Sequence, residues 1–185
     1  AYLEKCGAVI TGAGTECIRV RGKGVLQSAE FFAKPDRIVA GTYMAAVAAC
    51  GGSVYLQGVT PSLCRGFLDV FTGMGMDIRM EGEAMLVHMY HRPVNLHKIC
   101  TGAYPDFPTD MQSIFMALLA TTEGTSNVIE TVFENRFMHV LELERMGAKI
   151  KTEDRKATIE GTNALKGAKV LATDLRAGAA VVLAG

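Results

Sequence analysis

The sequence lacks an excess of charge of either sign. Its 185 residues include 19 Lys and Arg against 19 Asp and Glu, so the formal net charge is zero. Proteins that bind nucleic acid neutralise its phosphates and normally carry a basic excess. The balanced charge therefore argues against nucleic acid as a partner.

The sequence also lacks a hydrophobic run of the roughly 20 residues needed to cross a bilayer. Its longest apolar stretches have the length of one core helix. Residues 1–10 (AYLEKCGAVI) show neither the basic start nor the long apolar middle of a signal peptide. We expect no membrane partner and a cytoplasmic location.

Paired cysteines are missing as well. The five cysteines are Cys6, Cys17, Cys50, Cys64 and Cys100, an odd number without any Cys-x-x-Cys pair. A disulfide framework or a zinc knuckle is therefore not expected, and a reducing compartment fits better. We expect the thiols to behave as small buried hydrophobic groups. The histidines show no metal-ligand spacing, so we expect no metal and no cofactor.

The sequence does contain enough apolar material for a folded core. Hydrophobic residues make up 49% and charged residues 21%, which is typical of globular chains. This length allows one sizeable core or two small domains. The chain starts without Met inside an apparent helix end and stops soon after another helix begins. We therefore expect a piece of a longer protein.

An internal repeat of about 70 residues organises the chain. Gly7, Gly75 and Gly147 each follow the end of a predicted helix and precede a predicted β-hairpin. Glycine supplies the left-handed residue that ends a helix at no steric cost. The runs 148–150 and 157–159 are typical of the paired strands of such a hairpin.

A second repeated feature is an aspartate at the start of an apolar helix. Asp36, Asp110 and Asp174 occupy these places. Aspartate is a favoured N-terminal cap, and its charge complements the helix dipole. These helices are apolar nearly all round, and a helix without a polar face is buried on every side. We expect the first helix of each repeat inside the domain, with sheets and second helices outside.

Predicted strands lie on both sides of these helices. Two strands follow the first and second helices, at 53–59 and 125–132. The segments 94–100 and 168–173 are candidate strands before the second and third helices. The repeated unit is therefore strand, helix, strand, helix, strand, strand.

These units predict an α/β fold with two parts. Residues 1–34 are interpreted as the tail of a preceding repeat or of an adjoining domain. Residues 35–185 contain two repeats and the start of a third.

The stretch from Phe107 to His139 holds the polar residues least expected in a purely structural segment. Asp110 is open to two interpretations. It is an N-terminal cap, which Asp36 and Asp174 at equivalent places favour, or a carboxylate that accepts a proton from a substrate hydroxyl.

Two arginines are open to similar alternatives. Arg136 forms a surface ion pair with Glu134 or Glu142, or it clamps a substrate carboxylate or phosphate. Arg176 lies in the first turn of an apolar helix, where a cation opposes the helix dipole unless an anion lies alongside. His139 is expected to be a capping or packed histidine.

Four segments closely resemble the UDP-N-acetylglucosamine 1-carboxyvinyltransferases, a family of bacterial enolpyruvyl transferases of cell-wall synthesis. They are FPTDMQ from Phe107, TVFENRFMHV from Thr131, ELERMGA from Glu142 and ATDLRA from Ala172. The resemblance covers essentially the whole chain and implies a segment of a protein roughly twice as long. It implies an inside-out α/β barrel built from repeated βαβαββ units, here incomplete.

The resemblance also implies an activity. These enzymes transfer the enolpyruvyl group of phosphoenolpyruvate to the 3′-hydroxyl of UDP-N-acetylglucosamine and release phosphate. The route is an addition followed by an elimination, and it is the first committed step of peptidoglycan precursor synthesis. Both compounds are therefore the expected partners.

Six residues match substrate-binding positions of the family. They are Asp110, Val132, Phe133, Arg136, Asp174 and Arg176. The resemblance implies that Asp110 is the catalytic residue, a general base that binds the sugar hydroxyl. Val132 and Phe133 would form the wall beside the sugar. Arg136 and Arg176 would lie near the carboxylate of phosphoenolpyruvate, with the second aspartate as their acidic companion.

One departure from the family limits what this chain does alone. The family's catalytic Gly-Cys loop is absent, and none of the five cysteines matches it. We predict that the chain by itself is inactive and needs the missing half of the enzyme. Two alternatives stay open, a shikimate-pathway enolpyruvyl transferase and a non-catalytic repeat scaffold.

Overall fold

The computed structural model describes residues 1–22 and 24–185, which form two compact units, Ala1–Lys34 and Pro35–Gly185. The first unit contains α1 (Tyr2–Lys5) and an antiparallel hairpin of β1 (Val9–Thr11) and β2 (Arg19–Arg21). Gly7 lies between helix and hairpin with φ at 93°. The predicted order of helix end, glycine and hairpin is confirmed here.

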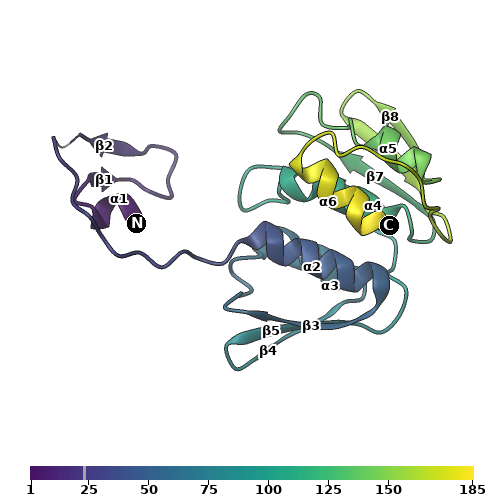
Figure 1. The fold of residues 1–185 in the computed structure, drawn as a ribbon, viewed down its shortest axis with the longest axis horizontal. Coiled ribbons are helices and arrows are strands. Elements are labelled where there is room, and N and C mark those ends of the chain that lie inside the picture. The colour runs from purple at the N-terminus through teal and green to yellow at the C-terminus, as the bar shows by residue number, and fades with distance from the viewer. Residues whose placement is uncertain (23) are drawn as a thin grey trace. The chain divides into compact units, whose positions relative to one another are not determined.

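The second unit repeats one order of elements (Figure 1). The first copy consists of α2 (Arg37–Cys50), β3 (Gly52–Gln57), α3 (Arg65–Gly73), β4 (Asp77–Glu81) and β5 (Ala84–Met89). The second copy consists of β6 (Lys98–Cys100), the 3-10 turn η1 (Thr109–Met111), α4 (Gln112–Leu119), β7 (Thr125–Ile129), α5 (Val140–Arg145), β8 (Lys149–Glu153) and β9 (Lys156–Glu160). A further helix, α6 (Leu175–Ala184), follows, so the predicted repeat is confirmed.

The two sheets of this unit share one pairing plan. The strand order is β3-β5-β4 in the first sheet and β6-β7-β9-β8 in the second. In each, the strand after the first helix pairs antiparallel with the second strand of the hairpin. Gly75 and Gly147 precede the hairpins with φ at 96° and 93°. These are the left-handed positions that the glycine spacing predicts.

One predicted strand is wrong and another is shorter than expected. Residues 168–173 form no strand in the structure. β6 covers only the end of the segment 94–100, and it is held by parallel pairing with β7. A strand requires such a partner for its backbone groups. The described residues provide no equivalent neighbour for 168–173.

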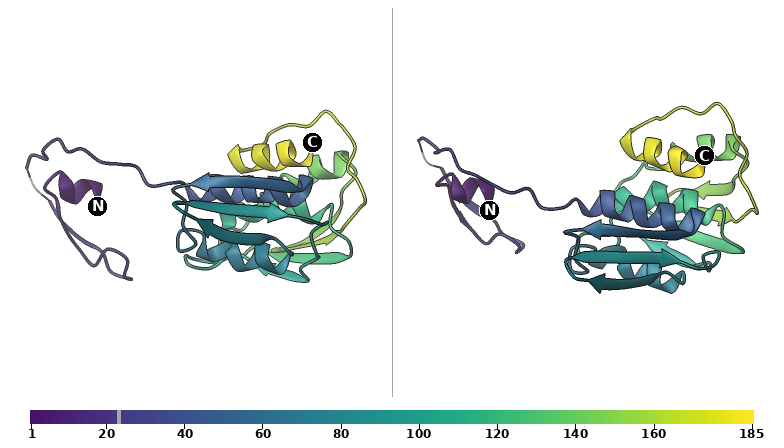
Figure 2. Two further views of the ribbon diagram at one scale, coloured as in Figure 1. Left: turned by 90° about the horizontal axis from the view of Figure 1, so that it is seen from below. Right: turned by 60° about the horizontal axis from the view of Figure 1, so that its bottom comes forward.

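The helices α2 and α4 lie side by side between the two sheets, and α6 packs mainly against α4 (Figures 1 and 2). All eight residues of α4 are buried, as the absence of a polar face predicts. The same prediction is wrong for α2 and α6, where Tyr43, Leu175 and Val182 are exposed. These three side chains line an apolar groove of about 890 Å³ between the two helices.

Aromatic side chains connect α3, the second helix of the first copy, to the central helix α4. The ring of Phe115 on α4 lies 4.7 Å from that of Phe71 on α3 and 4.9 Å from that of Phe107. Phe67 meets Phe71 edge-on at 6.1 Å between ring centroids. Phe67, Phe71 and Phe115 are almost completely buried. This cluster fixes α3 and the start of the Phe107 turn against α4.

The cysteine prediction is only half right. All five thiols are free, and Cys6 and Cys64 are buried, but Cys17, Cys50 and Cys100 are exposed. The alternation of β6 turns Ile99 inward and Cys100 outward, which explains one of them. Burial raises the pKa of the Cys64 thiol to about 11. In the part of the chain that the structure describes, no helix is long and apolar enough to cross a membrane.

Replacing Phe115 by alanine is expected to lower the free energy of unfolding by about 3–5 kcal/mol, because it opens a cavity beside the rings of Phe71 and Phe107. Denaturant unfolding of the variant measures this loss. The matched control is Leu141→Ala on α5, where the side chain is exposed and the change should stay within about 1 kcal/mol. Equal losses in the two variants would contradict the assignment of Phe115 to the core.

Candidate functional site

Asp110 lies inside the 3-10 turn η1 that leads into α4, directly after Pro108 and Thr109. Its carboxylate binds two arginines. Arg136 donates from Nη2 to Oδ1 at 2.8 Å, and Arg176 donates from Nη2 to Oδ2 at 2.9 Å. One carboxylate therefore bridges two cations that come from different repeats.

The interpretation of Asp110 as a helix cap is wrong. Asp36 and Asp174 do cap their helices, since Oδ1 of each accepts two backbone N–H groups of the first turn. Both capping residues have extended backbone conformations just before the helix. Asp110 is instead part of the turn, and η1 and α4 have no side-chain cap. Its carboxylate is thereby available to the arginines.

The surface ion pair considered for Arg136 is also wrong. Glu134 pairs with Arg155 at 3.4 Å and Glu142 pairs with Arg145 at 2.9 Å, while Arg136 turns to Asp110. The Arg136 guanidinium carbon also lies 4.7 Å from the ring centroid of Phe133. Such cation–π stacking fixes the plane of the guanidinium.

Arg176 has the anion that its place in the first turn of α6 requires. That anion is Asp110, at the start of the neighbouring helix. The two helices are joined a second time, because the Ser113 hydroxyl donates to the backbone carbonyl of Arg176 at 3.0 Å. The N-terminal ends of α4 and α6 therefore lie side by side.

The two arginines also set the charge of Asp110. Partial burial by itself raises the pKa of the carboxyl, but the hydrogen bonds and charges of Arg176 and then Arg136 act in the opposite direction. The net result is a pKa below the ordinary value. Asp110 is therefore an anion at neutral pH with both oxygens occupied.

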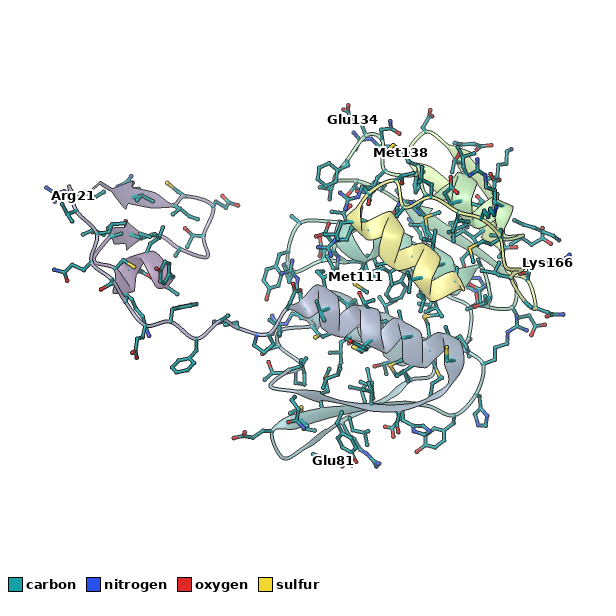
Figure 3. All side chains as sticks on the ribbon, in the orientation of Figure 1. Arg21, Glu81, Met111, Glu134, Met138 and Lys166 are labelled. Atoms are coloured by element: carbon teal, nitrogen blue, oxygen red, sulfur yellow. The ribbon has the colours of Figure 1, made fainter. Side chains whose placement is uncertain are left out.

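A cavity of about 450 Å³ opens over this cluster. Five of the six predicted site residues line it, together with the rest of the segment 133–136 and two apolar side chains. The lining residues are Asp110, Phe133, Glu134, Asn135, Arg136, Met138, Asp174, Leu175 and Arg176. Figure 3 marks this region by Glu134 and Met138. The sixth residue, Val132, directly precedes the lining and has a partly exposed side chain.

The sequence pattern did not single out every polar group at this place. Glu130 is almost completely buried, and its carboxylate accepts hydrogen bonds from the hydroxyls of Thr101 and Thr109 and from the backbone N–H of Val132. A charged residue inside the predicted strand 125–132 was the available signal. Within residues 1–22 and 24–185, no three His, Cys, Asp or Glu side chains gather as a metal site would require.

His139 is a packed histidine, as predicted, and not part of the cavity lining. It is almost completely buried, and its Nε2 lies 3.3 Å from Sδ of Met116 on α4. Burial lowers the pKa of His139 to about 4, with a smaller opposing effect of Asp174. The imidazole is therefore neutral in the folded protein at neutral pH.

This neutral histidine predicts a loss of stability in acid. The folded-state pKa of about 4 lies below the ordinary 6.5, so the stabilisation is complete above about pH 6.5 and is lost as the pH falls through 4. The loss is at most on the order of 3 kcal/mol. Urea unfolding at several pH values measures it, and His139→Leu should show a flatter pH dependence. Identical pH dependence in both proteins would contradict the prediction.

Comparison with known proteins places this site in a family. The whole chain, residues 1–185, matches the family model described as EPSP synthase (3-phosphoshikimate 1-carboxyvinyltransferase). The chain belongs to the EPSP synthase family. Within the family, curated relatives at 45–50% identity are named UDP-N-acetylglucosamine 1-carboxyvinyltransferase.

Two relatives illustrate the extent of the match. The chain is 50% identical over 187 residues to UDP-N-acetylglucosamine 1-carboxyvinyltransferase 1 of Caldanaerobacter subterraneus subsp. tengcongensis, which covers 100% of this chain and 44% of the relative. It is 47% identical over 183 residues to the enzyme of Nitrobacter winogradskyi, covering 99% of this chain and 43% of the relative. The predicted resemblance is confirmed. The chain spans less than half the length of these relatives.

Solved structures agree on the fold of the family. The enolpyruvyl transferase NikO from Streptomyces tendae superposes with a TM-score of 0.79 at 24% identity, over 98% of this chain and 44% of that chain. An EPSP synthase from Acinetobacter baumannii superposes with a TM-score of 0.63 at 18% identity, over 85% of this chain and 38% of that chain. The predicted α/β fold of the enolpyruvyl transferases is thereby confirmed.

Proposed function

We propose that the protein containing this chain transfers the enolpyruvyl group of phosphoenolpyruvate to the 3′-hydroxyl of UDP-N-acetylglucosamine, with release of phosphate. The observation that carries this proposal is the convergence of Arg136 and Arg176 on Asp110 in one cavity. The names of relatives at 45–50% identity support the choice of substrates. In this proposal the enzyme acts in the cytoplasm, at the first committed step of peptidoglycan precursor synthesis.

The two arginines fit the anionic groups of the substrates. A guanidinium presents a planar fork of donors that matches a carboxylate or a phosphate. In the structure, part of this capacity is used by Asp110. A substrate anion that takes over these contacts would also free an oxygen of Asp110. Substrate binding would thus prepare the carboxylate for its chemical role.

Asp110 is the proposed general base. A base must lie within hydrogen-bond reach of the hydroxyl whose proton it removes. When the sugar 3′-oxygen bonds to C2 of phosphoenolpyruvate, the hydroxyl proton passes to the carboxylate, the C2–C3 double bond opens and C3 takes up a proton. Loss of a C3 proton together with the phosphate at C2 then restores the double bond. Phe133 and Val132 would form the wall that holds the sugar, and Asp174 would keep the first turn of α6, with Arg176, in place.

We further propose that residues 35–185 are part of an inside-out α/β barrel and that residues 1–34 are the tail of an adjoining domain. The exposed apolar faces of α2 and α6 support this, because they are the faces that further barrel elements would cover. The chain's share of its relatives' length, 43–44%, also fits one incomplete half of the enzyme. The 185-residue chain alone is accordingly predicted to be inactive.

The first test is Asp110→Ala in the full-length protein. Loss of a general base should reduce kcat by roughly 10²–10⁴-fold. The matched control is Asp36→Ala, which removes a real cap and should cost about 1 kcal/mol of stability while kcat is kept. A release assay for inorganic phosphate measures turnover. A variant Asp110→Ala with nearly normal kcat would contradict the role of general base, and a full-length wild-type protein without any turnover would support the alternative of a non-catalytic repeat scaffold.

The second test concerns Arg176. Arg176→Lys keeps the charge but loses the planar fork, so kcat/KM for phosphoenolpyruvate should fall by roughly 10- to 100-fold. The control is Arg145→Lys, an exposed arginine paired with Glu142 on α5, where no change is expected. Steady-state kinetics with each substrate varied in turn measures both. Equal kinetics of the two variants would argue against an anion-binding role.

The acceptor substrate distinguishes the proposed enzyme from a shikimate-pathway enolpyruvyl transferase. The family model is named for an enzyme that acts on 3-phosphoshikimate, whereas the similar relatives are named for UDP-N-acetylglucosamine. Offering each acceptor separately to the full-length protein with phosphoenolpyruvate decides between them. Phosphate release with 3-phosphoshikimate alone would overturn the proposed substrate.

A further inference from the structure

Glu130 is a buried carboxylate directly behind the Asp110 turn. It follows the last residue of β7 and is only 1% exposed. A buried carboxylate is costly unless its oxygens are well hydrogen-bonded. Among the residues that the structure describes, no basic side chain lies within ion-pair distance of Glu130. Its compensation must therefore come from neutral donors.

Four neutral donors surround it. Oε1 accepts from the Thr101 hydroxyl at 2.8 Å and from the backbone N–H groups of Val132 at 2.8 Å and Phe133 at 3.2 Å. Oε2 accepts from the Thr109 hydroxyl at 2.8 Å. A carboxylate is purely an acceptor, so its chemistry matches all four partners. The hydrogen bonds to both oxygens hold the Glu130 carboxylate in one orientation.

These donors belong to three segments that lie apart in sequence. Thr101 follows β6, Thr109 opens the turn that contains Asp110, and Val132 begins the wall segment after β7. Thr101 is joined to the wall a second time, since the Thr131 N–H donates to its hydroxyl at 2.8 Å. One side chain thus fixes the distance between the Asp110 turn and the wall.

Stability by itself is a weak reason for an acidic group at this place. Even a buried ion pair can often be replaced by well-packed apolar residues without loss of stability, so a buried charge is weak evidence of a stabilising role. An apolar residue, however, would leave the two hydroxyls and two amides without their common acceptor. The turn and the wall would then be free to shift relative to each other.

We propose that Glu130 is a positioning residue for the sugar nucleotide. Through the Thr109 hydroxyl it sets the turn that carries Asp110, and through two amides it sets Val132 and Phe133. The inference rests on the proposed function, in which these groups contact the sugar. Glu130 itself touches no substrate in this scheme. Its larger effect is expected on the sugar nucleotide, and a smaller effect on phosphoenolpyruvate passes through the contacts of Asp110 and Phe133 with Arg136.

The test is Glu130→Ala in the full-length protein. A displacement of about 1 Å in positioned groups can cost about 10²-fold, so kcat/KM for UDP-N-acetylglucosamine should fall roughly 10- to 100-fold. KM for phosphoenolpyruvate should change less than the KM for UDP-N-acetylglucosamine. Glu130→Gln keeps the shape and one acceptor oxygen, so its loss should be smaller. Calorimetric binding of UDP-N-acetylglucosamine gives a readout that does not depend on turnover.

Ser126→Ala is the matched control for a merely structural effect. Ser126 lies on β7, the strand that Glu130 follows, and is 1% exposed. Its hydroxyl donates to Oδ1 of Asn95 at 2.6 Å. Its replacement also removes a buried hydrogen bond of β7, at the end away from Asp110. Melting temperature should fall in this variant, while the affinity for UDP-N-acetylglucosamine stays at the wild-type value.

A double variant tests the route through Thr109. If Glu130 acts on Asp110 through the Thr109 hydroxyl, then Thr109→Val and Glu130→Ala are not additive in kcat. If Glu130→Ala does not fold, the additivity of Thr109→Val and Glu130→Gln in kcat can be measured instead. Additive losses in kcat would overturn the route.

The outcomes separate this inference from the proposed function. Folded Glu130 variants with wild-type KM and affinity for UDP-N-acetylglucosamine, or with losses equal to those of Ser126→Ala, would overturn the positioning role. A wild-type protein that binds UDP-N-acetylglucosamine but transfers no enolpyruvyl group would overturn the proposed function instead. In that case the binding comparison alone still decides the role of Glu130.

Discussion

The packing of residues 35–185 is organised by the burial of one helix without a polar face, α4. Every residue of α4 is shielded from solvent, by α2 and α6 and by the sheet that contains β7 and β9. Apolar surface of this extent drives the packing of the neighbouring elements. The same packing brings the start of α6 beside the start of α4, where the Ser113 hydroxyl binds the Arg176 carbonyl. The site therefore forms where the central helices begin.

At that end, three aspartates of the same repeat position serve two purposes. Asp36 and Asp174 have extended backbones and cap their helices. Asp110 lies inside the 3-10 turn η1, which directly follows Pro108. Its carboxylate points to two arginines. Because the backbone differs in this one repeat, the Asp110 carboxylate does not cap a helix and can bind the arginines. The buried Glu130 fixes that altered turn through Thr109.

The electrostatic arrangement is one anion shared by two cations at a cavity. Neither arginine side chain pairs with an acidic sequence neighbour, because Glu134 and Glu142 are paired elsewhere and Asp174 caps α6. The Phe133 ring orients one guanidinium, and the first turn of α6 positions the other. Preorganised charges of this kind need little rearrangement when an anionic ligand arrives. This is the physical basis of the enolpyruvyl transfer that we propose.

The sequence by itself determined the repeat, the hairpins and the family motifs, because these depend on glycine positions, alternation and neighbouring residues. It also pointed to Asp110, Arg136 and Arg176 one by one. Only the tertiary structure decided that they meet, since these contacts join residues 26 and 66 positions apart. It likewise decided that 168–173 forms no strand and that α2 and α6 keep exposed faces. Strand pairing and burial depend on distant neighbours, which a local pattern does not contain.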